Sequence, residues 1–322
     1  MTKSEWPQRF LKFLSIFYLQ FVVVIYMTSE RHPVICRSET EEYFVDPVSS
    51  TKKRFPSLSA PAELQLSVIV PAYNEQERLP KMMDECLDYL EARRKESEHF
   101  QYEVIVVDDG SSDKTTEVAL KYSHKFGTDK VRVLTFEKNR GKGGAVRLGM
   151  MSSRGEHLLF ADADGASSFP DYSKVEMKMR KICDSNKTNE AIVCGSRAHL
   201  QDEAVATRSL FRTLLMHGFH FMVWLLCVRG IRDTQCGFKL LTRQAARSTF
   251  SNLHVERWAF DVELLYIAQT LGIPIGEVAI NWKEIDGSKM VPVWSWLQMG
   301  RDLLLIRFRY LIGAWQLKEK EL

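Results

Sequence analysis

From about residue 64 onward, short apolar runs are separated by longer stretches in which apolar residues recur with helical spacing. The apolar runs are four to six residues long and rich in valine, isoleucine and leucine, which is typical of buried strands. The predicted strands are 66–70, 104–107, 131–136, 158–161 and 191–194. The predicted helices between them include 77–95, 113–126 and 141–153. Because strands alternate with helices, we predict an α/β fold with an open, mostly parallel sheet and flanking helices.

Polar and aromatic residues follow the first two predicted strands. Pro71, Tyr73 and Glu75 come after the first, and Asp108 and Asp109 come after the second. Ligands of such sheets bind beyond the carboxyl ends of the strands, so these loops should converge on one crevice. A tyrosine there can stack on a base, a glutamate can accept from a ribose, and an aspartate can accept the imide N–H of uracil. The alternative is that these residues form strand-end turns and helix caps.

The fourth predicted strand runs directly into Asp162-Ala163-Asp164-Gly165. Two carboxylates spaced one residue apart at a strand end can hold a hard divalent cation through oxygen ligands. A cation so placed can neutralise a diphosphate as it leaves, which favours a nucleotide-sugar transferase. The alternative is an Asp-Gly turn with solvated acids.

A glycine-rich segment, Asn139-Arg140-Gly141-Lys142-Gly143-Gly144, opens the helix predicted at 141–153. Its backbone amides and its two cations, Arg140 and Lys142, suit phosphate oxygens. The spacing is neither that of a P-loop nor that of a dinucleotide-binding GxGxxG turn.

Composition narrows the class of protein. The chain has 322 residues, 45% of them hydrophobic, and a net charge of only +3, so nothing indicates nucleic-acid binding. Its six cysteines are scattered without zinc-ligand spacing, which favours reduced thiols in a reducing compartment. The sequence leaves the oligomeric state open, including a homo-oligomer.

Four further segments complete the predicted organisation around a catalytic domain at 64–290. Residues 1–29 contain an apolar stretch, 10–27, that we interpret as a transmembrane signal anchor, and the proline-containing residues 30–63 as a linker. Residues 208–230 combine apolar residues with arginines and histidines, which favours a membrane-surface helix over an ordinary buried helix. Residues 291–322 mix tryptophans with arginines, as in amphipathic segments at a membrane surface.

The motifs PAYNE, VVDDGSSD, NRGKGGA, ADADG, CGSRAH, DTQCGFK, FDVELL and GSKM occur in this order. In the identity and order of these motifs, the chain resembles the family 2 glycosyltransferases that use polyprenyl-phosphate acceptors, over about residues 64–315. The segments ERWAFDVELLYIA, DGSKM and WSWLQM are closer to the glucosyl than to the mannosyl members. The resemblance implies a GT-A fold, UDP-glucose as donor, Mg²⁺ or Mn²⁺, and dolichyl phosphate as acceptor. It also implies the endoplasmic reticulum membrane, with the catalytic domain facing the cytosol.

The resemblance also implies roles for single residues. Positions that contact the donor nucleotide in the family are matched by Tyr73, Glu75 and Asp109. The family's metal motif is matched by Asp162 and Asp164. Arg197 and Arg208 match positions that meet the acceptor phosphate, and Lys289 lies in a loop motif near the diphosphate. Asp261 is expected to steady the glucose hydroxyls or to orient arginines. The remaining expected donor contacts are Pro71, Asp108, Arg140, Lys142, Ala163 and Lys239.

One departure and two alternatives accompany this assignment. Some mannosyl relatives carry a glutamine metal ligand two residues after the second aspartate, where this chain has Ala166. The ligand set must therefore be completed by substrate oxygens, water or another residue. The alternatives are a dolichyl-phosphate mannosyltransferase that uses GDP-mannose, and a nucleotide-sugar-binding scaffold subunit without activity.

Overall fold

The computed structural model describes residues 5–200, 210–285 and 292–318. Its central sheet has seven strands in the order β5-β4-β3-β6-β8-β7-β9. The strands are β3 (Leu64–Ala72), β4 (Tyr102–Asp108), β5 (Val131–Thr135), β6 (Gly155–Ala161), β7 (Ile192–Ser196), β8 (Phe238–Thr242) and β9 (Ile275–Ala279). The helices are α1 (Glu5–Thr28), α2 (Leu79–Glu96), α3 (Thr115–Phe126), α4 (Lys142–Met151), α5 (Tyr172–Asn186), α7 (Leu210–Leu226), α8 (Arg243–Phe250), α9 (Phe260–Thr270) and α10 (Pro292–Leu311).

All five strands expected from the apolar runs form, and the sheet is mostly parallel as predicted. Two strands, β8 and β9, were not anticipated. β8 is antiparallel to both of its neighbours, β6 and β7, whereas every other pairing in this sheet is parallel. Because β8 runs in the opposite direction, its first residue, Phe238, pairs with Ala161, the last residue of β6. The turn before β8 therefore lies at the same edge as the carboxyl ends of the other strands.

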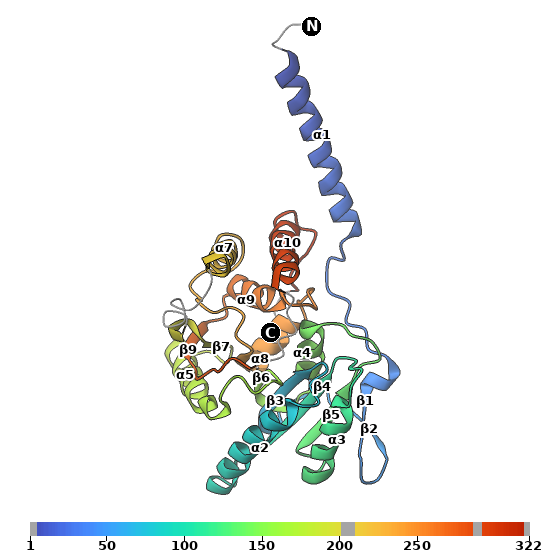
Figure 1. The fold of residues 1–322 in the computed structure, drawn as a ribbon, viewed down its shortest axis with the longest axis vertical. Coiled ribbons are helices and arrows are strands. Elements are labelled where there is room, and N and C mark those ends of the chain that lie inside the picture. The colour runs from blue at the N-terminus through green and yellow to red at the C-terminus, as the bar shows by residue number, and fades with distance from the viewer. Residues whose placement is uncertain (1–4, 201–209, 286–291, 319–322) are drawn as a thin grey trace.

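Helices cover both faces of the sheet (Figure 1). Alternate strand residues point to opposite faces: Ile69 and Ile105 pack in a core with α4, α8 and α9, and Val68 and Val104 in a core with α2, α3 and α5. Strands buried on both faces explain the continuous apolar runs in the sequence.

The segment at 30–63, interpreted as a linker, contains ordered structure. A short 3₁₀ turn (Glu39–Glu42) leads into a two-stranded antiparallel sheet formed by β1 (Tyr43–Val45) and β2 (Lys52–Arg54). Phe44, Phe55 and Leu58 are buried in the core on the α4 side. Three apolar anchors distributed along the segment thus hold it against the domain, although they lack any periodicity that the sequence analysis could use.

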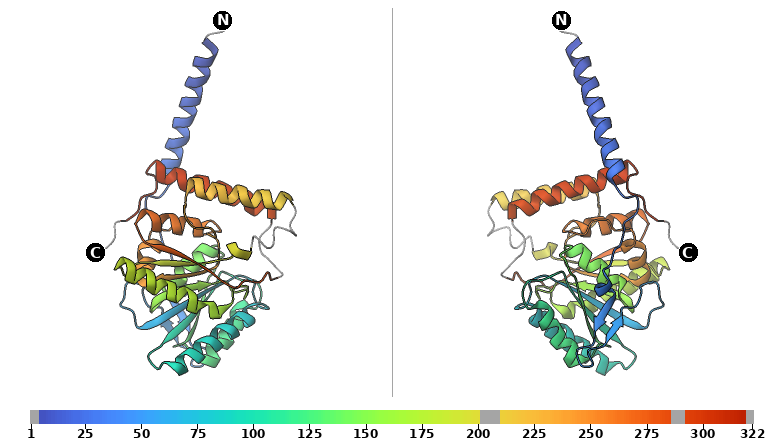
Figure 2. Two further views of the ribbon diagram at one scale, coloured as in Figure 1. Left: turned by 90° about the vertical axis from the view of Figure 1, so that its left-hand side faces the viewer. Right: turned by 90° about the vertical axis from the view of Figure 1, so that its right-hand side faces the viewer.

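Helices α7 and α10 lie side by side across one end of the domain, and α1 rises from the same end (Figure 2). The Phe21 ring of α1 contacts the Phe308 ring of α10, with centroids 5.7 Å apart. Large apolar side chains are exposed on this layer, namely Phe221, Trp224, Leu225, Leu297, Leu304 and Leu311. Among the described helices, none combines the length and apolar character needed to cross a bilayer, so the transmembrane anchor predicted at residues 1–29 is not confirmed.

A buried ionic cluster lies near the N-terminal ends of β3, β4 and β5, at the opposite edge from the strand-end acids. The Glu103 carboxylate is fully buried, accepts from the Ser67 hydroxyl at 2.6 Å and from the Arg154 amide at 2.7 Å, and forms an ion pair with Arg132. Burial, together with the nearby Arg154 charge, lowers the pKa of Arg132 to about 9, although Glu63 acts in the opposite direction. The arginine thus depends on Glu103 for a compensating charge.

We predict that Glu103→Ala lowers the free energy of unfolding by about 3–5 kcal/mol, because it leaves the Arg132 charge buried without its partner. Arg180→Ala removes the exposed partner of an i,i+4 pair with Glu176, which Arg93 still binds, and should cost about 0.5 kcal/mol or less. Denaturant titration of the two variants measures both effects. An equal loss of unfolding free energy in the two variants would show that Glu103 is not needed to compensate the Arg132 charge.

Candidate functional site

The loops after β3 and β4 are bound to each other at the carboxyl edge of the sheet. The Asn74 amide donates to Ser111 Oγ at 2.8 Å, and the Glu75 amide donates to the Thr115 hydroxyl at 2.7 Å. Asn74 has φ of 54°, a left-handed conformation that asparagine adopts more readily than most residues. Tyr73 lies in this loop with 41% of its surface exposed, so its ring can stack on a planar ligand.

Three other residues near these loops that were predicted to contact the donor, Glu75, Asp108 and Pro71, are buried within the protein. Glu75 is buried and accepts from Arg78 Nε at 2.6 Å. The buried Asp108 carboxylate accepts from the Ser111 amide at 2.9 Å and from the Thr116 hydroxyl, so it shapes the turn and the start of α3. Pro71 is buried within β3. A direct donor contact fits neither the burial of Asp108 nor that of Pro71.

Asp109 holds the glycine-rich loop. Its two carboxylate oxygens accept from the amides of Arg140 at 2.7 Å and Gly141 at 2.8 Å, and one of them also accepts from Asn139 Nδ2 at 2.9 Å. Gly141 has φ of 94°, a backbone conformation that favours glycine. Burial raises the pKa of Asp109 to about 6, although the two amide N–H groups act in the opposite direction. The Arg140 side chain points to the Cys36 carbonyl and to Glu41, not to the Asp162 carboxylate.

The first acid of the Asp-x-Asp motif is held between α4 and the turn before β8. Asp162 Oδ1 lies 2.6 Å from Lys142 Nζ, at the start of α4. The Asp162 amide donates to the Gly237 carbonyl at 3.0 Å, and a Cβ at Gly237 would lie 2.0 Å from Asp162 Oδ2. Only glycine therefore allows this position of the carboxylate. Burial lowers the pKa of Lys142, but the Asp162 and Asp261 charges outweigh it and the net shift is upward.

The second acid, Asp164, accepts from the Ala166 amide at 2.9 Å. Burial raises its pKa, and the adjacent Asp162 charge raises it further. Among the described residues, no group of three or more His, Cys, Asp or Glu side chains could hold a metal ion. Mg²⁺ is commonly bound by one or two carboxylates together with substrate phosphates, so Asp162 and Asp164 fit a site that a diphosphate completes.

Lys239 and Asp261 form a buried pair beneath these acids. Lys239 Nζ lies 2.6 Å from Asp261 Oδ1 and donates to the Cys236 carbonyl at 2.7 Å, and both side chains are almost completely buried. Burial raises the pKa of Asp261, and the two lysines, Lys239 and Lys142, oppose that increase. The predicted donor contact of Lys239 and the predicted sugar contact of Asp261 do not fit this burial. The pair instead supports the floor of the site.

Arg197 is oriented by a residue that the sequence analysis did not single out. Its Nε and Nη2 donate to the two oxygens of Asp233 at 2.7 and 2.9 Å, and its amide donates to the same carboxylate at 2.9 Å. Asp233 is buried and its own amide donates to Glu277. A guanidinium has five N–H donors, so three remain for a ligand. Burial lowers the pKa of Arg197, but the Asp233 partner raises it more strongly.

The predicted site is thus only partly assembled from the expected residues. Asp109, Lys142, Asp162, Asp164 and Arg197 lie at one edge of the sheet, with the buried Ala163 between the two acids. Arg208 and Lys289 lie outside the described residues. Sequence reasoning missed Arg78, Asp233 and Gly237. The last two belong to the quoted DTQCGFK motif, but their partners are 36 and 75 residues away in sequence, and no local pattern reveals such contacts.

Comparisons with known proteins identify the family of this chain. Residues 67–250 match the family model described as "Glycosyl transferase family 2". A relative from Mus musculus named dolichyl-phosphate beta-glucosyltransferase is 62% identical over 92% of this chain and 91% of its own length. The proteins of the same name from Homo sapiens and Saccharomyces cerevisiae are 61% and 44% identical, over 92% and 80% of this chain and 91% and 78% of their own lengths.

The fold is similar to solved structures of glucosyl-3-phosphoglycerate synthase from Mycobacterium tuberculosis. One of them, in complex with Mn²⁺, UDP and glucosyl-3-phosphoglycerate, has a TM-score of 0.51 and 19% identity over 76% of this chain and 80% of that chain. Another, in complex with UDP, has a TM-score of 0.51 and 18% identity over 78% and 81%. At this identity the likeness shows a GT-A-like α/β fold and nothing more specific.

The pKa of Asp109 generates a prediction about pH. An ordinary aspartate has a pKa of 3.8, whereas Asp109 in the folded protein has a pKa of about 6. The folded protein therefore binds a proton at Asp109 more tightly than the unfolded chain does. The contribution of Asp109 to the free energy of unfolding should therefore decrease as pH rises from about 4 to above 6, by about 3 kcal/mol. Denaturant titrations at several pH values should show that the stability difference between wild type and Asp109→Asn shrinks over this window. A constant difference would refute the raised pKa.

Proposed function

Because the chain belongs to the family 2 glycosyltransferases, we propose that it transfers glucose from UDP-glucose to dolichyl phosphate, giving dolichyl β-D-glucosyl phosphate. The observation that carries the proposal is that Asp162 and Asp164 at the end of β6 lie near three cations, namely Lys142, Arg197 and Arg78. In the proposal, the lipid-linked glucose serves as a donor for assembly of the N-glycan precursor.

The charges suit a reaction between two anions. The Asp162 charge contributes to the raised pKa of Arg197, and Asp162 and Asp164 both contribute to that of Arg78, after the larger effects of burial and of their carboxylate partners. These cations can offset the repulsion between an acceptor phosphate and a donor diphosphate. Such stabilisation acts strongly because the groups are fixed before the reaction starts.

The residues fit a direct displacement. A phosphate oxygen of the acceptor forms a bond to the anomeric carbon, the bond from that carbon to the diphosphate breaks, and UDP leaves. Attack from the face opposite the leaving group inverts the α-glucoside of the donor to a β-linked product. The acceptor is already an anion, so no side chain has to remove a proton from it. The burial of Asp261 and its ion pair with Lys239 agree with this, because they leave it unsuited to act as a general base.

A divalent cation, Mg²⁺ or Mn²⁺, would be held by Asp162 and Asp164 and would neutralise the charge that develops on the leaving diphosphate. Asp109 supports the donor site by fixing the glycine-rich loop, and Tyr73 offers an exposed ring for the base. Arg197, oriented by Asp233, keeps three N–H donors for the acceptor phosphate. This division of roles retains Asp109, Asp162, Asp164 and Arg197 from the sequence analysis and adds Asp233 as a positioning residue.

We place the enzyme at the endoplasmic reticulum membrane, with the catalytic domain in the cytosol. The layer formed by α7 and α10 supports attachment to a membrane surface, because it exposes Trp224, Leu297, Leu304 and Leu311 on the end from which α1 rises (Figure 2). A lipid-borne acceptor would reach the site from that end.

The proposal predicts lipid-linked [¹⁴C]glucose when the purified protein receives UDP-glucose and dolichyl phosphate, and little transfer from GDP-mannose. Asp162→Asn and Asp164→Asn keep the side-chain shape but lose charge, so each should lower the rate on the order of a thousandfold while the protein stays folded. Preferred transfer from GDP-mannose would identify a mannosyltransferase instead. No transfer from either donor would favour a scaffold protein.

Lys142 generates a second prediction, because its ammonium occupies one oxygen of Asp162. Lys142→Met removes a competing positive charge, so the affinity for Mn²⁺ without nucleotide should rise by about tenfold. Lys138→Met, at an exposed position of the same loop, is the control and should change it little. Electron paramagnetic resonance titration of free Mn²⁺ measures both. An unchanged or weaker affinity in Lys142→Met would contradict a metal site at Asp162.

A further inference from the structure

A cavity of about 610 Å³ lies where the C-terminal ends of α1 and α10 meet the loop before α9. Neither Asp162 nor Asp164 lines it. The wall contains four arginines and two glutamates, together with a histidine and a tryptophan. The charged residues are Arg140, Arg147, Arg257, Arg309, Glu30 and Glu256. The cavity therefore carries an excess of positive charge outside the proposed catalytic site.

Two of the four arginines are already paired. Arg147 forms an ion pair with Glu256, and Arg140 one with Glu41. In the described part of the chain, neither Arg257 nor Arg309 has a carboxylate partner, and Arg309 instead lies over the Trp315 ring at 4.8 Å. Burial lowers the pKa of Arg309, as it does that of Arg147, so these positive charges are held at a cost that an anion would relieve.

Unpartnered polar atoms are concentrated at the same place. Six buried side-chain nitrogen or oxygen atoms in the described residues have no hydrogen-bond partner, and four of them belong to residues that line this cavity. The four are Ser29 Oγ, Arg147 Nε, His254 Nε2 and Arg309 Nε. Buried polar groups in native proteins are nearly always hydrogen-bonded, so a concentration of exceptions points to a ligand.

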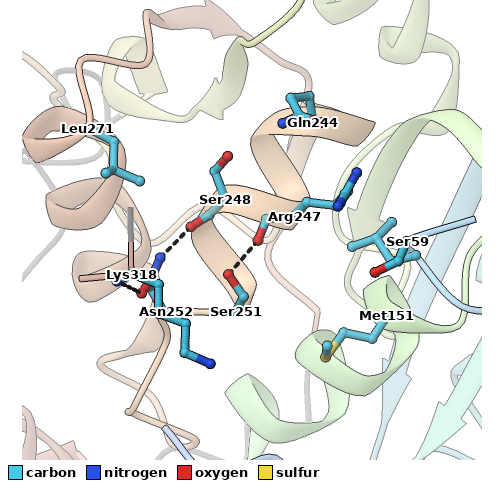
Figure 3. A pocket seen from close by; sticks show the side chains of 10 residues that line it. Ser59, Met151, Gln244, Arg247, Ser248, Ser251, Asn252, Leu271 and Lys318 are labelled. Carbon is cyan, nitrogen blue, oxygen red and sulfur yellow. Dashed lines mark hydrogen bonds between the residues drawn. The ribbon is translucent and has the colours of Figure 1, made fainter. Parts of the chain in front are cut away.

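A smaller cavity provides a contrast. It measures about 170 Å³, and Figure 3 shows hydrogen bonds between several of the residues that line it. Asn252 Nδ2 donates to the Ser248 carbonyl at 2.8 Å and Ser251 Oγ to the Arg247 carbonyl at 2.7 Å, while Asn252 Oδ1 accepts from the Lys318 amide at 2.7 Å. These polar groups need no ligand. Both cavities are lined by basic residues, Arg247 and Lys318 in the smaller one, so the larger cavity differs in its unpartnered buried polar atoms.

We infer that the larger cavity binds a phosphate group, held by Arg257 and Arg309. Guanidinium groups match the oxygens of a phosphate with paired N–H donors, and the volume leaves room for the group that carries it. The Trp315 and His254 rings stack at 4.1 Å and make one wall rigid. Thr28 and Ser29, at the end of α1, also line the cavity. Its place beside α1, which exposes Val23, Val24 and Met27, suits the headgroup of an anionic phospholipid as well as a soluble phosphate ester.

The test uses the full-length protein and the double variant Arg257→Gln/Arg309→Gln. The matched control is Arg94→Gln/Arg180→Gln, which removes the same charge from α2 and α5, on the other face of the sheet. Flotation measures binding to phosphatidylcholine vesicles with and without phosphatidic acid, and calorimetry measures binding of inorganic phosphate without vesicles. If the double variant does not fold, Arg257→Glu, at an exposed position, takes its place.

The wild type and the control should bind at least one of the two phosphate probes about tenfold more tightly than the double variant does. A loss confined to vesicles with phosphatidic acid identifies a lipid headgroup, and a loss for inorganic phosphate identifies a soluble phosphate. Equal binding of both probes by the double variant and the control would overturn the inference.

Discussion

The site depends on four alternating charges at the carboxyl edge of the sheet. Asp162 pairs with Lys142, and Asp261 pairs with Lys239. The two acids and two lysines come from four different elements, so each ion pair also fixes the position of a helix against a strand. Burial alone would lower the pKa of both lysines, but the pKa of each is raised because opposite charges lie beside it. The position of Asp162 follows from this arrangement together with Gly237, whose missing side chain leaves room for the carboxylate.

The reversed strand β8 makes this arrangement possible. Because β8 is antiparallel to β6, the turn before it reaches the edge at which β6 ends, and Lys239 enters the sheet beneath Asp162. The same turn carries Asp233, which orients Arg197 at the end of β7. One segment thus connects the acids proposed to bind the donor through a cation with the arginine proposed to meet the acceptor. A GT-A-like fold can in this way bring two phosphate-bearing substrates together without a general base.

Much of this could be predicted from the sequence, because apolar runs and strand-end acids are local signals. Asp162 and Asp164 follow β6 as expected, and the parallel core of the sheet forms from the expected runs. What the sequence did not reveal depends on contacts between distant residues. Lys239 and Asp261 are 22 residues apart, and nothing in their surroundings shows that each is buried against the other. Phe44, Phe55 and Leu58 likewise anchor the segment taken as a linker through the far side of the core. Arg78 was overlooked because one arginine after a strand-end turn has no distinctive spacing.

The central claim is that the two acids and the donor diphosphate together complete a cation site. The most direct measurement is ³¹P electron–nuclear double resonance of Mn²⁺ added to the protein with UDP-glucose. The account predicts strong hyperfine coupling to phosphorus in the wild type and its loss when both Asp162 and Asp164 are changed to Asn. Mn²⁺ that couples to phosphorus equally well in that double variant, or that shows no phosphorus coupling in the wild type, would contradict it.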